Sequence, residues 1–212
     1  MTDELASLLD RLVAAFPDEQ RIALRPPPDE SGWGGYAKRF SGHARRWFEA
    51  TDGQVDARPA VDGYRFESLA NALATVAITE ELRAEPEGYW VEPSWLAIAG
   101  DGAGQHFMID DDDGRVLAVA HDDDAVTVLA DSPEEWLEGL LADHASGALV
   151  FHRTFGLTSA EELAAMERRQ AEIRARNQPG PLPLKHKLGL TLTLMLTTGL
   201  MALLIWWLES NR

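Results

Sequence analysis

The chain has 212 residues, of which 45% are hydrophobic and 25% charged, a composition that excludes global disorder and allows one ordinary domain with an appended segment. It carries 35 acidic and 19 basic side chains, a net charge of −16, and residues 1–150 hold 30 of the acids and 11 of the bases. Because phosphate contacts need clustered Lys and Arg, this acidic part argues against direct nucleic-acid binding and suits either a basic partner or a solvated acidic surface. The absence of cysteine excludes disulfides, thiolate nucleophiles and cysteine-based zinc sites.

The N-terminal third is predicted to contain two helices and a loop. Apolar residues recur at helical spacing over residues 3–16, which predicts an amphipathic helix ended by Pro17. This segment has no basic n-region, so we do not expect a signal peptide. Residues 25–35, RPPPDESGWGG, read as a loop, and the aromatic residues of 36–48 mark a second helix closed by TDG at 51–53.

The middle of the chain is predicted to form a sheet. Residues 64–68 are a short strand, and Ser68 caps a third helix that runs to about Arg83. Four runs rich in Val, Ile, Leu and Phe predict further strands at residues 94–100, 105–110, 115–121 and 125–130. The connections DDDG at 111–114 and HDDD at 121–124 contain the Asp and Gly residues that hairpin turns require.

Two helices with capping boxes follow the sheet. Ser132 is the predicted N-cap of the first, with Pro133 at the first helical position and Glu135 at the third. A second capping box that begins at Ser159 opens a charged helix to about Asn177. The predicted buried face of the first of these helices consists of Trp136, Leu137, Leu140 and Leu141.

Residues 188–208 contain no charged side chain and predict a membrane-spanning helix, since their 21 residues rise by roughly 30 Å at about 1.5 Å each. Six cations precede this span: Arg168, Arg169, Arg174, Arg176, Lys185 and Lys187. The positive-inside rule therefore predicts a single-pass, tail-anchored membrane protein whose N-terminal part is cytoplasmic. The expected organisation is a domain over 1–150, a charged helix and Pro-rich juxtamembrane linker over 151–187, the span over 188–208 and a short tail over 209–212.

Two runs of aspartate, 110–113 and 122–124, lie in the predicted turns of the sheet. An EF-hand alignment on Gly114 fails, because its first and twelfth positions are Ile and Ala. The six histidines lack zinc-ligand spacing, and GDGAG at 100–104 lacks the helix and lysine of a phosphate-binding loop. We expect no catalytic residue, no metal and no cofactor. The aspartates are then solvated turn tips or part of an acidic binding face, with a carboxylate pair of an acidic hydrolase as the remaining alternative.

A set of short motifs recurs in a recognisable order: WFEATDGQ, YRFESL, WLAIAGDGAGQHFMIDDDDGRV and VLADSPEEWLEGLL. Over roughly residues 30–145 this order resembles the SUKH superfamily, which includes the Smi/Knr-type cell-wall regulators. The positions that match the pattern include Phe48, Asp52, Gly53, Trp95, Asp101, Gly102, Gly104, Asp110, Ser132 and Trp136. Asp52 replaces the usual Asn of the family, and nothing in the pattern corresponds to residues 188–208.

The resemblance implies an α+β fold, a mostly antiparallel sheet of about four to six short strands with helices packed against it, to which the C-terminal transmembrane helix is added. It also implies a non-catalytic protein-binding domain, commonly an immunity protein that neutralises a cognate toxin, often a nuclease and hence basic. The alternative is a tail-anchored scaffold or regulator that recruits a cell-envelope partner. Candidate partner-binding residues are two loop aromatics, Trp33 and Trp90, and the acids Asp101, Asp110, Asp111, Asp112, Asp113, Asp122, Asp123 and Asp124. Trp95 and Trp136 are expected in the core, and Gly102 and Gly104 in a tight turn.

Overall fold

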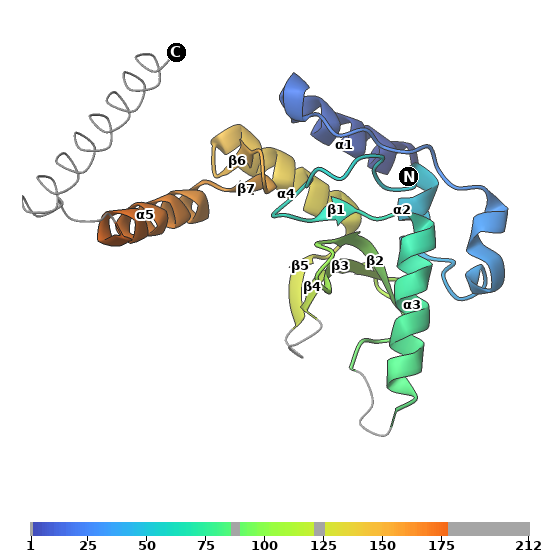
Figure 1. Ribbon diagram of the computed structural model, residues 1–212. Coiled ribbons are helices and arrows are strands. Elements are labelled where there is room, and N and C mark those ends of the chain that lie inside the picture. Colours follow the sequence, from blue (N-terminus) through green and yellow to red (C-terminus); the bar gives the residue numbers. More distant parts are fainter. Residues whose placement is uncertain (1, 86–89, 121–125, 178–212) are drawn as a thin grey trace, which may run out of the picture. The chain divides into compact units, whose positions relative to one another are not determined.

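The computed structural model describes residues 2–85, 90–120 and 126–177 (Figure 1). The chain divides into two units between Ala164 and Ala165, and each is described by itself. In chain order the elements are α1 (Thr2–Ala15), η1 (Asp18–Gln20), η2 (Glu30–Tyr36), α2 (His43–Ala50), β1 (Arg65–Phe66), α3 (Leu69–Arg83), β2 (Trp95–Gly100), β3 (Gln105–Asp110), β4 (Val116–Ala120), β5 (Val126–Ala130), α4 (Pro133–Ser146), β6 (Leu149–His152), β7 (Gly156–Ser159) and α5 (Ala160–Asn177). The predicted α+β class is confirmed.

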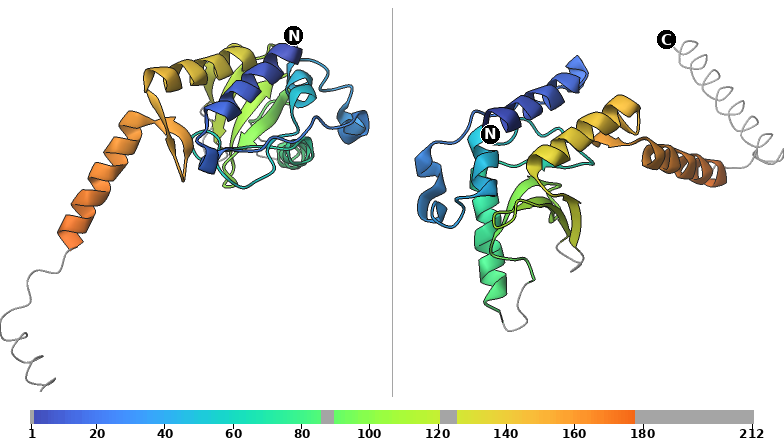
Figure 2. Two further views of the ribbon diagram at one scale, coloured as in Figure 1. Left: turned by 90° about the horizontal axis from the view of Figure 1, so that it is seen from above. Right: turned by 180° about the vertical axis from the view of Figure 1, so that it is seen from behind.

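Strands β1 to β5 form one antiparallel sheet in sequential order. Because side chains alternate along a strand, one face contributes Leu96, Ile98, Phe107, Ile109 and Val116 to the main core. The opposite face carries a smaller apolar cluster that contains Ala97, Met108, Leu117 and Val119. Figures 1 and 2 show α1 and α4 together over the sheet and α3 beside it. Most of the buried apolar residues therefore lie on one face of the sheet, and the opposite face carries only the smaller cluster.

Trp136 on α4 lies among the aromatic rings of the main core. Its ring lies 6.1 Å from Trp47, 6.4 Å from Phe66 and 5.5 Å from Phe107. Trp47 and Phe48 of α2 are completely buried, and burial of a large apolar side chain contributes on the order of 1.5–3 kcal/mol. The prediction that Trp136 is a core residue is confirmed.

The helix predicted over residues 36–48 does not exist as one element. The 25–35 loop prediction is also wrong in its second half, because η2 occupies Glu30–Tyr36, and a separate helix, α2, begins only at His43. Residues 37–42 separate η2 from α2, and the backbone amides of Ser41 and Gly42 in this segment donate to the distant carboxylate of Asp111. Periodicity along the chain cannot reveal a break that a remote side chain stabilises.

Trp33 was predicted to be an exposed loop aromatic, and this is wrong: only 2% of its surface is exposed. The turn of η2 places its ring edge-on to Phe48 at 5.9 Å, and the guanidinium of Arg45 lies over it at 5.4 Å. Trp33 is therefore a core residue with a cation–π contact, and its indole is not available to a partner.

No sequence pattern predicts the hairpin of β6 and β7, and the domain boundary predicted at residue 150 falls inside β6. Leu157 of β7 is fully buried and forms a parallel bridge with Val61. Gly156 has a φ of +72°, and a Cβ there would lie 2.4 Å from the carbonyl oxygen of Ala60. This close approach fixes the hairpin against the loop that precedes β1, so the first unit extends past residue 150.

The charged helix predicted after Ser159 is confirmed as α5, with the Ser159 hydroxyl accepting from the Glu162 amide at 3.3 Å. The linker and the membrane span predicted at 188–208 lie outside the described residues. None of the helices in the described ranges is both long enough and apolar enough to cross a bilayer.

Candidate interaction surface

The first aspartate run begins with two carboxylates that the protein already uses internally. Asp110 is 7% exposed and accepts from the Trp95 indole at 3.0 Å and from the Asp112 amide at 3.1 Å. Asp111 accepts from the amides of Ser41, Gly42 and Ala44, the last at 2.8 Å. It thus supplies the N-terminal cap that α2 lacks in its own sequence. These two residues hold segments of the fold together, a correction to their assignment to a free acidic face.

Other motif residues have the same kind of role. One oxygen of Asp52 accepts from the Leu69 amide at the start of α3 at 2.7 Å, and Ser132 caps α4 through the Glu135 amide at 3.1 Å. Asp101 accepts from two amides of the turn between β2 and β3, at 2.7 and 3.0 Å. The positive φ values of Gly102 and Gly104, +77° and +100°, confirm the predicted tight turn.

Gly53 is the motif position with the least freedom. Its φ is +70°, and a Cβ would lie 2.3 Å from the carbonyl oxygen of Glu67. The close approach lets the segment after α2 lie along β1, where the Gln54 amide donates to the Phe66 carbonyl at 3.1 Å. A side chain at position 53 would separate these two segments.

The remaining candidate acids do not form one face. Asp112 and Asp113 are exposed at the β3–β4 turn, where Asp113 pairs with Arg115. The turn that contains Asp101 lies at the opposite end of β3, six residues and roughly 17 Å away at about 3.4 Å per residue. Asp122, Asp123 and Asp124 lie outside the described residues. Trp90 is partly buried, with its ring edge-on to Trp95 at 6.2 Å.

A groove of about 440 Å³ opens between α4, the end of β5, the start of β6 and the loop before β1. Its apolar lining is Val61, Phe107, Leu129, Ala130, Trp136, Leu140 and Leu149. Leu129 reaches the groove because β5 carries a bulge: Val116 pairs with Ala130 and Leu117 with Val128, which leaves Leu129 as the extra residue. Gly139 on α4 leaves its part of the wall open, since a Cβ there would meet nothing within 4 Å.

Three carboxylates, Asp62, Glu135 and Asp143, form the polar part of the lining, and no basic side chain lines the groove. All three are exposed, and none forms an ion pair with any residue that the structure describes. By contrast, Glu134 next to Glu135 is paired with Arg46. The groove therefore presents uncompensated negative charge beside apolar surface.

Tyr64, whose ring stacks on that of Phe107 with centroids 4.0 Å apart, is a titratable group near Asp62. Burial first, and then the negative charges of Asp101 and Asp62, raise the pKa of Tyr64 above its ordinary value. A neighbouring carboxylate disfavours phenolate because like charges repel. The same field favours a cation in this region.

This arrangement suits binding of a basic and apolar segment of another protein. The stem of a Lys or Arg can lie on Trp136, Leu140 and Leu129 while its head reaches the carboxylates. No group of three or more His, Asp or Glu side chains among the described residues is placed to hold a metal ion.

Sequence reasoning missed this groove, although one signal was available. Glu135, Gly139 and Asp143 follow one another at a spacing of four, which places them on one face of α4 next to the buried stripe of Trp136 and Leu140. The contributions of the loop before β1 and of the β5 bulge depend on tertiary structure and leave no local pattern.

Residues 36–139 match the model of the SMI1 / KNR4 family (SUKH-1), which covers about half of the chain. No curated protein matches the chain. The matched segment includes β1 to β5, α2, α3 and the first half of α4, and it contains 22 acidic and 8 basic residues, a net charge of −14.

Proposed function

We propose, from the premise that residues 36–139 are a SMI1/KNR4 (SUKH-1) domain, that the protein acts without catalysis by binding and neutralising a basic partner protein, a cognate toxin. Proteins of this superfamily are generally immunity proteins, which fits a protein partner. The proposal depends on one observation above others: the groove beside α4 combines apolar surface with three carboxylates that have no basic neighbour among its lining residues.

Charge complementarity supports a basic partner. A toxin that cleaves nucleic acid must carry clustered Lys and Arg to bind phosphate. The domain carries a net charge of −14, which accelerates the encounter with such a surface. Once the partner is bound, the apolar lining excludes water from the ion pairs and strengthens them. Coverage of the toxin's basic surface would then prevent the toxin from binding its nucleic-acid substrate.

We expect the toxin to be encoded by a gene adjacent to that of this protein, and the test uses the product of that adjacent gene. The triple variant Asp62→Asn, Glu135→Gln and Asp143→Asn keeps the shape of the groove and removes its charge. We expect its affinity for the toxin to fall by at least about tenfold, since three rim charges at roughly 0.5 kcal/mol each exceed the 1.4 kcal/mol of one decade. Protection of toxin-expressing cells should fall in parallel.

The matched control removes the same charge elsewhere. Asp10→Asn, Glu81→Gln and Glu92→Gln change three exposed acids with no ion pair in the described residues. Equal weakening by both triple variants would show that only net charge matters and would refute the groove. If expression of this protein leaves sensitive cells as sensitive to the toxin as before, and envelope-synthesis enzymes co-purify with it, the protein is instead a regulator.

We further propose that residues 188–208 tether the domain to a membrane. The support is the 21-residue uncharged run and the six cations in the 20 residues before it, from Arg168 to Lys187, which favour the cytoplasmic side. The full chain should stay in membranes during alkaline carbonate extraction, and a chain that ends at residue 187 should be released. Release of the full chain under the same conditions would refute the tether while leaving the groove untouched.

A further inference from the structure

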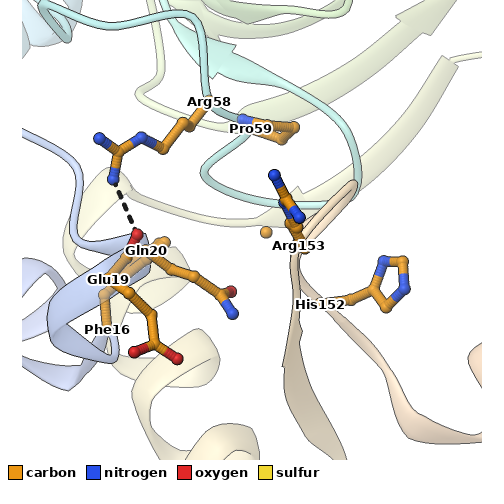
Figure 3. A pocket seen from close by; sticks show the side chains of 8 residues that line it. Phe16, Glu19, Gln20, Arg58, Pro59, His152 and Arg153 are labelled. Carbon is orange, nitrogen blue, oxygen red and sulfur yellow. Dashed lines mark hydrogen bonds between the residues drawn. The ribbon is translucent and has the colours of Figure 1, made fainter.

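A second cavity, of about 460 Å³, lies away from the acidic groove. Three segments that are distant in the sequence line it: the end of α1 with η1, the loop before β1, and the β6–β7 hairpin (Figure 3). Six of its eight lining residues lie outside 36–139, so the segments that flank the SUKH-1 match build most of it. None of its lining residues contributes to the groove.

Two arginines and one glutamate, Glu19, line this cavity, so its net charge is +1 with His152 neutral and is opposite in sign to that of the domain. Arg58 and Arg153 both line it, from different segments. Arg153 forms no ion pair or hydrogen bond through its side chain with any residue in the described ranges. The nearest carboxylate oxygen to Arg58 belongs to Asp56, at 3.9 Å, which is a weak contact. Figure 3 shows the Glu19 carboxylate directed away from Arg153.

Hydrogen bonds hold the side chain of Arg58, whereas Arg153 is exposed in the turn between β6 and β7. One terminal nitrogen of Arg58 donates to the carbonyl oxygens of Glu19 and Arg21, each at 3.2 Å, which leaves its other terminal nitrogen free of hydrogen bonds to described residues. The hairpin that carries Arg153 is fixed by the Leu157 amide, which donates to the Ala60 carbonyl at 2.9 Å. Phe16 and Phe151, with rings 4.3 Å apart, join the hairpin to α1.

A planar guanidinium fork matches the oxygens of phosphate, and two forks from separate segments can bind one phosphate from two sides. Phe16 and Pro59 add apolar wall beside them. The volume lies within the range of about 300–1,000 Å³ that small-molecule sites occupy. We infer that this cavity binds the phosphate group of a phosphate monoester.

The experiment is calorimetric titration of the full-length chain in a non-ionic detergent with two probes. Phenyl phosphate represents a soluble ester, and dihexanoyl phosphatidic acid, kept below its micellar concentration, represents a lipid headgroup. Saturable binding of either probe supports the inference, and the probe that binds more tightly identifies the source. Arg153→Gln should weaken binding by roughly ten- to a hundredfold, the effect of losing one charge-assisted hydrogen bond.

Lys38→Gln is the matched control, because it removes one exposed cation that has no ion pair among the described residues and does not line the cavity. Its affinity should equal that of the unmodified chain. Arg153→Lys keeps the charge but not the fork and should restore part of the affinity. No binding of either probe, or equal loss in Arg153→Gln and Lys38→Gln, would overturn the inference. Neither result would bear on toxin binding at the groove.

Discussion

The aspartates of the family motifs and the carboxylates of the groove are both acidic side chains at the surface of one domain, yet they are used differently. Asp52 and Asp111 accept hydrogen bonds from backbone amides at the starts of α3 and α2. Asp62 and Asp143 have no ion pair with the described residues and line an apolar groove. These motif aspartates therefore maintain the fold, whereas Asp62 and Asp143 are left for the partner binding that we propose.

The difference has a physical basis. A carboxylate that accepts from backbone amides at the start of a helix cannot turn to a partner without leaving those amides unpaired. A carboxylate on the groove is solvated before binding and exchanges water for a cation on binding.

The largest expected effect is a loss of stability on removal of a motif aspartate that caps a helix. Asp111→Ala removes the acceptor for the amides of Ser41, Gly42 and Ala44 and should lower the free energy of unfolding by about 2–4 kcal/mol. Asp112 is its neighbour in the same run, exposed and without a side-chain bond to any described residue. Asp112→Ala should change stability by less than about 0.5 kcal/mol in the same urea titration. Similar losses in both variants would contradict the capping role.

The second prediction concerns Asp52, the position at which the resemblance to the SUKH pattern implies Asn. Asp52→Ala leaves the Leu69 amide without its acceptor and should cost about 1–2 kcal/mol, measured by urea unfolding. Asp52→Asn keeps a carbonyl oxygen in place of the accepting atom and should change stability by less than about 0.5 kcal/mol. A large loss in the Asn variant would mean that the charge at the start of α3 matters more than the hydrogen bond.

The sequence predicted the fold more fully than the site, for reasons visible in particular residues. The strands and α4 follow from alternation, Asp-Gly turns and the capping box at Ser132, all of which act within a few residues. The break before α2 depends on Asp111, 67 residues after the Ala44 amide that it binds, and so has no local signal. Asp62 reaches the groove only because the β6–β7 hairpin packs against the segment before β1. Sites assembled from such tertiary contacts cannot be inferred from periodicity.

The third prediction concerns the contribution of the groove carboxylates to stability. The triple groove variant Asp62→Asn, Glu135→Gln and Asp143→Asn should unfold within about 1 kcal/mol of the unmodified chain, because none of the three carboxylates forms an ion pair with a described residue and repulsion among them is removed. The one hydrogen bond at stake, from the Asp131 amide to Glu135 at 2.9 Å, keeps an acceptor in the Glu135→Gln change. Asn also tolerates the φ of +48° at position 62 better than most residues do. Urea unfolding measures this directly. A strong destabilisation would place these carboxylates with the motif aspartates as parts of the fold.

The smallest effect links the groove to its surroundings through Tyr64. Burial and the charges of Asp101 and Asp62 raise the pKa of this phenol in the folded state. Because the folded pKa lies above the unfolded one, its contribution to stability is complete below about pH 10 and is lost as pH rises through the raised value. Tyr64→Phe should therefore flatten the decline in stability between about pH 9 and 11.

Asp62→Asn should lower the pKa of Tyr64 while leaving it above the ordinary value, because burial is the larger cause. Phenolate absorbance, compared between Asp62→Asn and the matched variant Asp10→Asn, measures that change. An equal pKa in the two variants would show that the charge of Asp62 is screened at this distance and that the groove is less negative than its composition indicates.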